Sequence, residues 1–391
     1  MILTYDVETT TKNKGNPFTA SNKLISYSCK SNDEDVSFSY YTDIDFLARL
    51  KDLIPKASLI IGFNLKFDLS WASRYSIHPS DKVRIWDCQI AEFIISGQKE
   101  PYPSLNESLA KYGLGNKDDK IAEYWELGLD TTDIPVEELK FYNNLDVELT
   151  YKLYLKQQEV MTDKQKRLCL VMGLDLLVLQ EMEENGVKFD RELCKLKADE
   201  TKTALEKITN ELLKYSPTPN INLDSGQQLS CLLYGGKFEL VSVDRVETRV
   251  YKSGEKKGTE YEKTIYRTDV YSCPRLFTPL PDTTAKKPMK LSSGEEVIWY
   301  LTNEDVLKQL KTPTAVHKKI IKLLLDIAEL TKLLDTYYGK LPDLLDKMEW
   351  GDFLHGQYNQ CVAATGRLSS SAPNMQNFSG DVDKLLISRY E

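Results

Sequence analysis

The chain has 391 residues, of which 41% are hydrophobic and 10% aromatic, so it is no disordered protein and can form two or three domains with cores of their own. Its seven cysteines are scattered singly and its three histidines lie far apart, which argues against a disulfide framework or a zinc site. The net charge of −8 lies mostly in residues 1–160, where 18 basic residues face 25 acidic ones, as expected of a domain that holds divalent cations through oxygen ligands.

No stretch has the pattern of a signal peptide, and no apolar run approaches the roughly 18 residues of a membrane span. Single cysteines are typical of proteins in a reducing compartment. We therefore expect a cytoplasmic protein with no membrane partner.

The first 160 residues alternate between strand and helix patterns. Strands are predicted at 2–8, 23–29, 35–41, 58–64 and 83–87, and helices at 43–54, 87–97, 105–112 and 135–158. Three successive strands followed by strand–helix alternation predict an α/β domain with a mixed sheet flanked by helices.

From about residue 166 the pattern becomes mostly helical. Helical periodicity runs through 166–186, 191–214, 303–310 and 315–348. Between these segments, an insertion at 238–300 alternates polar and apolar residues around a Gly-flanked basic loop at 252–258, which predicts a β-hairpin.

Acidic residues recur at particular places in the first domain. Asp6 and Glu8 are two apart on a predicted strand and share one face, where like charges repel unless a cation lies between them. Asp68 follows the strand that ends at Gly62-Phe63-Asn64. Taken singly, each of these acids has an ordinary explanation: a strand end in solvent, or an acid stabilised by a helix dipole.

A fourth acid lies on the predicted helix 135–158. Asp146 and Tyr142 are four residues apart and share a face. Asn143 and Asn144, between them, are poor helix formers with no evident packing reason to be there. A solvated helix face with Tyr142 half buried remains the alternative.

Together these residues resemble the DEDD exonuclease superfamily, in the subgroup with Tyr before the last Asp. The segment GFNLKFD at 62–68 is similar to the second motif of that family, and IWDCQIAEFII and SLNESLAKYGL are similar to the segments that follow it. The resemblance implies a ribonuclease-H-like fold over residues 1–165. It also implies that Asp6, Glu8, Asp68 and Asp146 bind two Mg²⁺ or Mn²⁺ ions, with Asp6 between the two.

The implied reaction is hydrolysis of the 3′-terminal phosphodiester of DNA. Two divalent ions roughly 3.5–4 Å apart activate the attacking water and stabilise the leaving oxygen. Tyr142 would orient the water, because its ordinary pKa near 10 makes it a poor base at neutral pH. Thr9 and Asn64 are expected to contact the terminal nucleotide.

The rest of the chain resembles the thumb and the beginning of the palm of family A DNA polymerases. LDLLVLQEMEENGVKFD, INLDSGQQLSCLLYGG and above all TGRLSSSAPNMQN at 365–377 are similar to segments of that family, from which the chain departs at Phe378. We expect a mostly α-helical thumb at 166–349, with a β-hairpin-containing insertion, and an incomplete palm at 350–391. Duplex contacts are expected from Arg367, Asn374, Gln376 and Asn377.

The insertion at 238–300 resembles one in the thumbs of phage polymerases. Lys252, Lys256 and Lys257 could grip DNA phosphates or dock another replication protein, and a solvated hairpin tip is equally compatible with the sequence. A phage gene would place the protein in the cytoplasm of the host cell.

No fingers or palm catalytic motif occurs in the sequence, so we expect that the chain cannot polymerise DNA alone. It is either a piece of a longer polymerase or the product of a split gene, and we expect the second. The predicted partners are then the 3′ end of single-stranded DNA, primer-template DNA and a separate chain with fingers and palm.

Two other functions are compatible with parts of the sequence. One is a stand-alone DEDD exonuclease that trims DNA or RNA 3′ ends, which a preference for RNA would support. The other is a non-catalytic DNA-binding or assembly subunit with a vestigial nuclease site, which would bind Mn²⁺ poorly.

Overall fold

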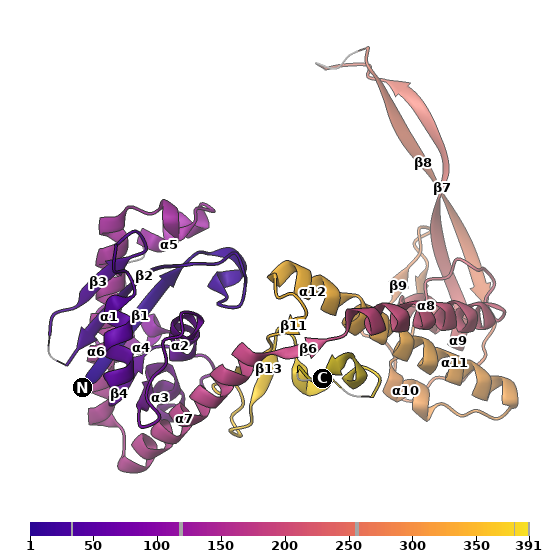
Figure 1. Cartoon of the computed structure of the whole chain (residues 1–391). Helices are drawn as coiled ribbons and strands as arrows, with labels where there is room; N and C mark the ends of the chain where they lie inside the picture. Colours follow the sequence, from indigo (N-terminus) through magenta and orange to yellow (C-terminus); the bar gives the residue numbers. More distant parts are fainter. Residues whose placement is uncertain (33, 117–119, 255–257, 379, 390–391) are drawn as a thin grey trace. The chain divides into compact units, whose positions relative to one another are not determined.

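The computed structural model describes residues 1–391 except 33, 117–119, 255–257, 379 and 390–391 (Figure 1). The chain forms two compact units, one of residues 1–194 with 340–391 and the other of residues 195–339. The boundaries between these units differ from the domain boundaries predicted after residues 165 and 349. The predicted exonuclease, thumb and palm boundaries therefore stay a prediction.

A five-stranded mixed sheet forms the centre of the first unit. Its strands, in spatial order, are β3 (Ser37–Tyr40), β2 (Leu24–Ser31), β1 (Ile2–Thr9), β4 (Leu59–Gly62) and β5 (Arg84–Asp87). β1 runs antiparallel to β2 and parallel to β4. Because β1 is central and its residues Leu3, Tyr5 and Val7 are buried, the acids that alternate with them hold fixed positions.

Helices flank this sheet, as predicted for a ribonuclease-H-like fold (Figure 1). They are α1 (Ala48–Leu53), α2 (Leu65–Arg74), α3 (Cys88–Ile95), α4 (Leu105–Tyr112), α5 (Lys120–Glu126), α6 (Val136–Val160) and α7 (Asp163–Asn185). The first begins at residue 48 rather than 43, and the fifth was missing from the sequence prediction. α6 packs on β1 and β2 and so brings its acidic face to the acids of the sheet.

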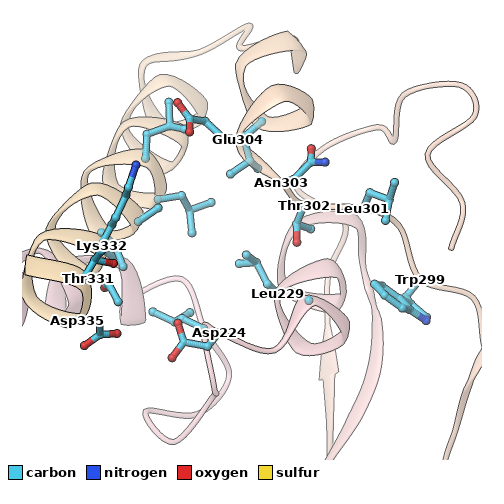
Figure 2. A pocket seen from close by; sticks show the side chains of 18 residues that line it. Asp224, Leu229, Trp299, Leu301, Thr302, Asn303, Glu304, Thr331, Lys332 and Asp335 are labelled. Atoms are coloured by element: carbon cyan, nitrogen blue, oxygen red, sulfur yellow. The ribbon is translucent and has the colours of Figure 1, made fainter. Parts of the chain in front are cut away.

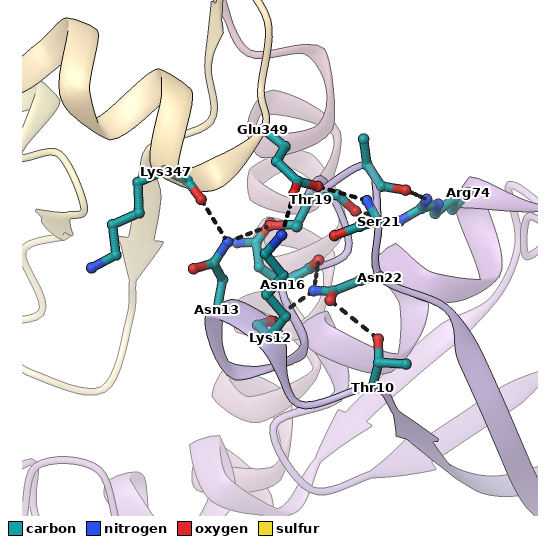
Figure 3. A network of polar contacts seen from close by, with 11 residues as sticks. Thr10, Lys12, Asn13, Asn16, Thr19, Ser21, Asn22, Arg74, Lys347 and Glu349 are labelled. Atoms are coloured by element: carbon teal, nitrogen blue, oxygen red, sulfur yellow. Dashed lines mark hydrogen bonds and ion pairs between the residues drawn. The ribbon is translucent and has the colours of Figure 1, made fainter. Parts of the chain in front are cut away.

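The loop after β1 is held by a polar network (Figure 3). Asn22 donates to the carbonyl oxygens of Lys12 and Asn16, and Arg74 donates to three further carbonyls of the loop. Glu349 accepts from the Ser21 amide at 2.8 Å and pairs with Lys12, and these contacts lower the pKa of Glu349 to about 2. Residues 10–22 thus contact both α2 and the segment that follows α12 (Lys340–Met348).

The C-terminal residues complete the first unit through small sheets. β6 (Val187–Phe189) lies between β11 (Phe353–Leu354) and β14 (Leu386–Ile387), while β12 (Gln357–Asn359) pairs with β13 (Ser369–Ser371). Lys66 of α2 donates to the Tyr358 carbonyl and forms an ion pair with Glu183 of α7. The family-like segment 365–377 therefore belongs to the same compact unit as the mixed sheet.

The second unit is mostly helical with one long β-ribbon. Its helices are α8 (Arg191–Leu213), whose first turn belongs to the other unit, α9 (Gly226–Tyr234), α10 (Glu304–Gln309) and α11 (Ala315–Lys332). The ribbon pairs β7 (Gly236–Val250) with β8 (Glu260–Cys273), and β9 (Met289–Lys290) pairs with β10 (Glu296–Val297). The helix predicted across 315–348 is interrupted by a π-helical turn at Leu333–Tyr338. Within the described residues, no helix combines the length and apolar character needed to cross a membrane.

Gly173 lets α7 approach the sheet closely. A Cβ at this position would lie 2.5 Å from the Ile85 carbonyl oxygen and 3.0 Å from the Ile85 Cβ. In an exposed helix, alanine in place of glycine stabilises by about 1 kcal/mol. Here the backbone of β5 cannot yield, so the steric clash outweighs that gain.

We predict that Gly173→Ala destabilises the protein by about 1–3 kcal/mol, the usual cost of overpacking. Thermal or urea unfolding measures this change. Asp175→Ala, at an exposed position of the same helix, is the control and should leave stability unchanged or slightly raised. A Gly173→Ala protein at least as stable as wild type would contradict the close packing of α7 on β5.

Candidate active site

Three carboxylates from two elements converge on one point. Asp6 and Glu8 of β1 and Asp146 of α6 each offer an oxygen, and these oxygens all lie within 4.8 Å of one another. Asp146 is buried, whereas Asp6 and Glu8 are partly exposed. The structure therefore brings together three of the four acids singled out from the sequence.

The fourth acid, Asp68, lies directly beside them. Its side chain is buried in the first turn of α2, and its Oδ1 accepts a hydrogen bond of 3.0 Å from the amide of Val7, the residue between Asp6 and Glu8. Burial, and then the charge of Asp6, raise the pKa of Asp68 well above its ordinary value. This carboxylate is close enough to Asp6 to be repelled by it.

The turn between β4 and α2 positions Asp68. Asn64 adopts a left-handed conformation with φ of 57°, and a Cβ on Gly62 would lie 2.5 Å from Leu65 Cδ1. The buried carboxylate of Asp87 accepts from the amide of Leu65 at 2.7 Å and also caps α3. These contacts explain why the chain reads Gly-Phe-Asn before this helix.

Asn143 contributes to the site in a way that the sequence prediction missed. Its Nδ2 donates to Oδ2 of Asp6 at 2.7 Å, which fixes the orientation of that carboxylate. The neighbouring Asn144 accepts from the Ser28 hydroxyl at 2.7 Å. Asn143 and Asn144 disfavour a helix, and this was the one sign in the sequence that their side chains have another role. In the structure each of them has a polar partner on the sheet.

Tyr142 is buried against aromatic and aliphatic side chains. Its ring meets that of Trp125 edge to face, with centroids 6.1 Å apart, in a cluster that includes Ile121 and Ile134. These contacts give Tyr142 a packing role. Its expected role in orienting water remains a prediction.

Of the residues expected to contact DNA, Asn64 and Thr9 lie near the acids in sequence. Asn64 is exposed and lines a pocket of about 340 Å³ together with Phe18, Phe67 and Asn359. Thr9 is buried at the end of β1, where its hydroxyl donates to the Thr10 carbonyl at 3.1 Å. Contact of Thr9 with a nucleotide remains a prediction.

The other expected DNA-binding residues lie on exposed loops and turns. Arg367 follows Gly366, and Asn374, Gln376 and Asn377 belong to a short 3₁₀ turn that Asn374 caps. Lys252 is exposed next to the tip of the β7–β8 ribbon, whereas Lys256 and Lys257 lie outside the described residues.

The second unit contains a pocket of a different character. It has a volume of about 640 Å³ and lies between α9, α10 and α11, with an apolar wall that includes Leu229 and Trp299 (Figure 2). Asp224, Glu304 and Asp335 also line it. This mostly apolar lining differs from the acidic centre on β1 and α6.

The acidic centre has the donor chemistry of a site for hard divalent cations. All of its candidate ligands are carboxylate oxygens, the ligand type preferred by Mg²⁺ and Mn²⁺. Exonuclease domains of the 3′–5′ class are generally dependent on divalent metals, and the cluster of Asp6, Glu8 and Asp146 is the candidate site here.

Two family matches cover most of the chain. Residues 3–162 match the family described as 3′-5′ exonuclease, and residues 260–386 match DNA polymerase family A. DNA polymerase I of Synechocystis sp. is 26% identical over 322 residues, which cover 80% of this chain and 26% of the relative. The DNA polymerase of Bacillus phage SP01 is 22% identical over 350 residues, which cover 87% of this chain and 36% of the relative.

The fold also matches a solved polymerase. The POL domain of Pol1 from M. smegmatis, solved in complex with DNA primer-template and dNTP, aligns with a TM-score of 0.62 and 17% identity. The alignment covers 97% of this chain and 52% of that one. This chain thus spans between about a quarter and a half of the length of these relatives.

The mixed sheet and the match over residues 3–162 define a 3′–5′ exonuclease domain with a ribonuclease-H-like fold. The chain thus combines a 3′-5′ exonuclease domain with a mostly helical region that, over residues 260–386, matches part of the domain of the family A DNA polymerases.

We predict that Asp68→Asn stabilises the protein in the absence of divalent cations at neutral pH. The pKa of Asp68 is higher in the folded chain than its ordinary value of 3.8, so its ionisation destabilises the fold as the pH rises through the folded value. Asparagine has the same shape, retains an acceptor for the Val7 amide and carries no charge.

Thermal unfolding in EDTA between pH 4 and pH 8 tests this prediction. The melting temperature of the variant should rise relative to that of wild type as the pH rises. Mg²⁺ should stabilise wild type more than the variant. A variant that loses stability relative to wild type with rising pH would show that burial and the charge of Asp6 do not raise the pKa of Asp68.

Proposed function

We propose that this chain is the 3′→5′ proofreading exonuclease and DNA-binding thumb portion of a family A replicative polymerase. The observation that carries the proposal is the convergence of Asp6, Glu8 and Asp146, with buried Asp68 bonded to the amide between the first two. The substrate would be the 3′-terminal phosphodiester of single-stranded DNA, delivered from a primer-template.

Each acid has a distinct part in this proposal. Asp6, Glu8, Asp68 and Asp146 would hold two Mg²⁺ or Mn²⁺ ions, which when bound supply the Lewis acidity that activates water and stabilises the leaving oxygen. Asn143 holds the Asp6 carboxylate in one orientation, and the Val7 amide does the same for Asp68. Tyr142 would orient the attacking water through its hydroxyl, and Asn64 and Thr9 would contact the terminal nucleotide.

We further propose that DNA synthesis depends on fingers and palm carried by a separate chain. In support, the family A match includes residues 350–386, where β11 and β14 pair with β6 and β12 pairs with β13. Arg367, Asn374, Gln376 and Asn377 would contact duplex DNA there, and Lys252 on the ribbon would contact DNA phosphates. Association with a chain of that kind, measured by co-purification, tests this part of the proposal. The proposed location of such a complex is the cytoplasm, that of the host cell for a phage protein.

We predict that Asp146→Asn lowers the rate of exonuclease cleavage by a factor of 10³ or more. Asparagine keeps the shape of the side chain but removes the charge that would hold a divalent cation. The assay follows 5′-labelled single-stranded DNA in Mg²⁺, where wild type should give a ladder that shortens from the 3′ end.

Asp199→Asn, an exposed position on α8, is the matched control and should retain the wild-type rate. A ladder from Asp146→Asn as strong as that from wild type would refute the assignment. Cleavage of RNA in preference to DNA would favour an RNA-trimming enzyme. No cleavage by either protein, even with added polymerase chain, would show a vestigial site.

A further inference from the structure

The β7–β8 ribbon carries its exposed apolar side chains on one face only. The ribbon pairs Val241 with Thr268, Val243 with Tyr266 and Val246 with Thr264 in antiparallel register. Paired residues of an antiparallel ribbon lie on the same face. The exposed large hydrophobic side chains in the described strands of the ribbon all fall on this face, here called the valine face: Val241, Val243, Val246, Val250, Tyr266 and Val270.

A β-bulge keeps this face continuous. Val243 and Val246 are three residues apart and would point to opposite faces of a regular strand. The register shifts between Val243 and Arg245, so that Asp244 is the additional residue and Val246 returns to the face of Val243. Without the bulge, the valines nearest the tip would lie opposite those nearest the base.

The opposite face is occupied by charged pairs. Glu247 accepts from both Arg245 and Arg249 at 2.7–2.8 Å, and Arg267 pairs with Asp269 at 3.0 Å. Such pairs satisfy charges in water, so this face is polar along the outer part of the ribbon, whereas at its base Phe238 is buried and Leu240 and Tyr271 pack on the core of the unit. The two faces of the ribbon therefore differ in character, and the exposed large apolar side chains of the described strands are confined to the valine face.

The side chains of the valine face are roughly half exposed, from 48% at Val250 to 66% at Val241. The ribbon extends beyond the helices of its own unit (Figure 1), and an isolated two-stranded ribbon is only marginally stable in water. A strand of 15 residues spans about 50 Å, long enough for a specific protein interface. Exposed apolar side chains that gather on one face are typical of protein-interaction sites.

The charges around the valine face indicate which kind of partner fits. Glu260 and Glu262 lie on this face near the tip, and Glu239 lies on it near the base. Lys237, on the same face, pairs with Glu295 at 3.1 Å. The acids repel DNA phosphates, so nucleic acid is a poor occupant.

A second copy of this chain fits poorly as well. Stacking two valine faces about a two-fold axis sets tip against tip or tip against base. In the first arrangement the ends that carry Glu260 and Glu262 lie together, and in the second each such end lies over the end that carries Glu239. Both arrangements place acids against acids.

We propose that the valine face docks a different protein, whose contact surface is apolar at its centre and basic at its rim. This inference is independent of the nuclease assignment, because the ribbon lies in the other compact unit from the acidic centre. The proposed docking surface is also separate from the lysine proposed to bind phosphates near the tip, because it is the valine face along the length of the ribbon.

Photo-crosslinking in the full chain identifies the partner. A benzoylphenylalanine residue replaces Val243 on the valine face or, as control, Lys263 on the opposite face, and the chain is produced in its natural host. The expected result is one protein crosslinked from position 243 and not from 263. That protein is then identified, purified and titrated against the unmodified chain.

A pair of triple variants tests whether the face itself makes the contact. Val241→Thr, Val243→Thr and Val246→Thr together should weaken the measured Kd at least tenfold. Threonine has nearly the shape of valine and also favours strands, so the ribbon should remain folded. Tyr261→Thr, Lys263→Thr and Ile265→Thr on the opposite face should change the Kd less than twofold.

Raising NaCl from 0.1 to 0.5 M should also weaken binding, because the rims are oppositely charged. The proposal is overturned by crosslinks to DNA or to a second copy alone, by equal crosslinking from both faces, by no crosslink, or by a Kd unaffected by the valine-face variant. The exonuclease activity of both triple variants is measured in parallel. Wild-type activity shows that a loss of partner binding comes from the ribbon and not from a defect of the whole chain.

Discussion

Repulsion between carboxylates at the end of β1 is the constraint on which the catalytic unit depends. Asp6 and Glu8 share a face of the central strand, and Asp68 and Asp146 are brought to it while buried. Because Asp68 and Asp146 are buried, water screens their repulsion by the other acids poorly, and the acids would separate unless the fold held them. Burial first, and then the charge of Asp6, raise the pKa of Asp68 above its ordinary value, so this carboxylate is costly to ionise in the folded chain.

Polar groups of the scaffold hold the acids in place. The Val7 amide binds Asp68, and Asn143 binds Asp6, while Asp87 fixes the turn that begins α2. Farther out, Arg74 ties the loop after β1 to the end of α2. The fold thus holds the acids in place without a cation, which lowers the stability of the protein. Binding of a cation would raise the stability again.

The sequence predicted the fold well because strands and helices follow local patterns, whereas the grouping of the four acids came from the resemblance to a known family. Strand alternation placed Asp6 and Glu8 on one face, and helical spacing placed Tyr142 and Asp146 on another. The role of Asn143 could not be predicted, because it depends on a contact between residues 137 positions apart. The π-helical turn at 333–338 also escaped prediction, since its apolar spacing resembles that of a continuous helix. The valine face required the position of a bulge, which alternation alone does not give.

The central claim is that the four acids form a site for two divalent cations, and calorimetric titration with Mn²⁺ at pH 7 tests it most directly. The account predicts two ions per wild-type chain, and at least one fewer for Asp6→Asn, with the remaining affinity lowered about tenfold or more. A wild-type chain that binds no Mn²⁺, or an Asp6→Asn chain that binds it as wild type does, would contradict the account.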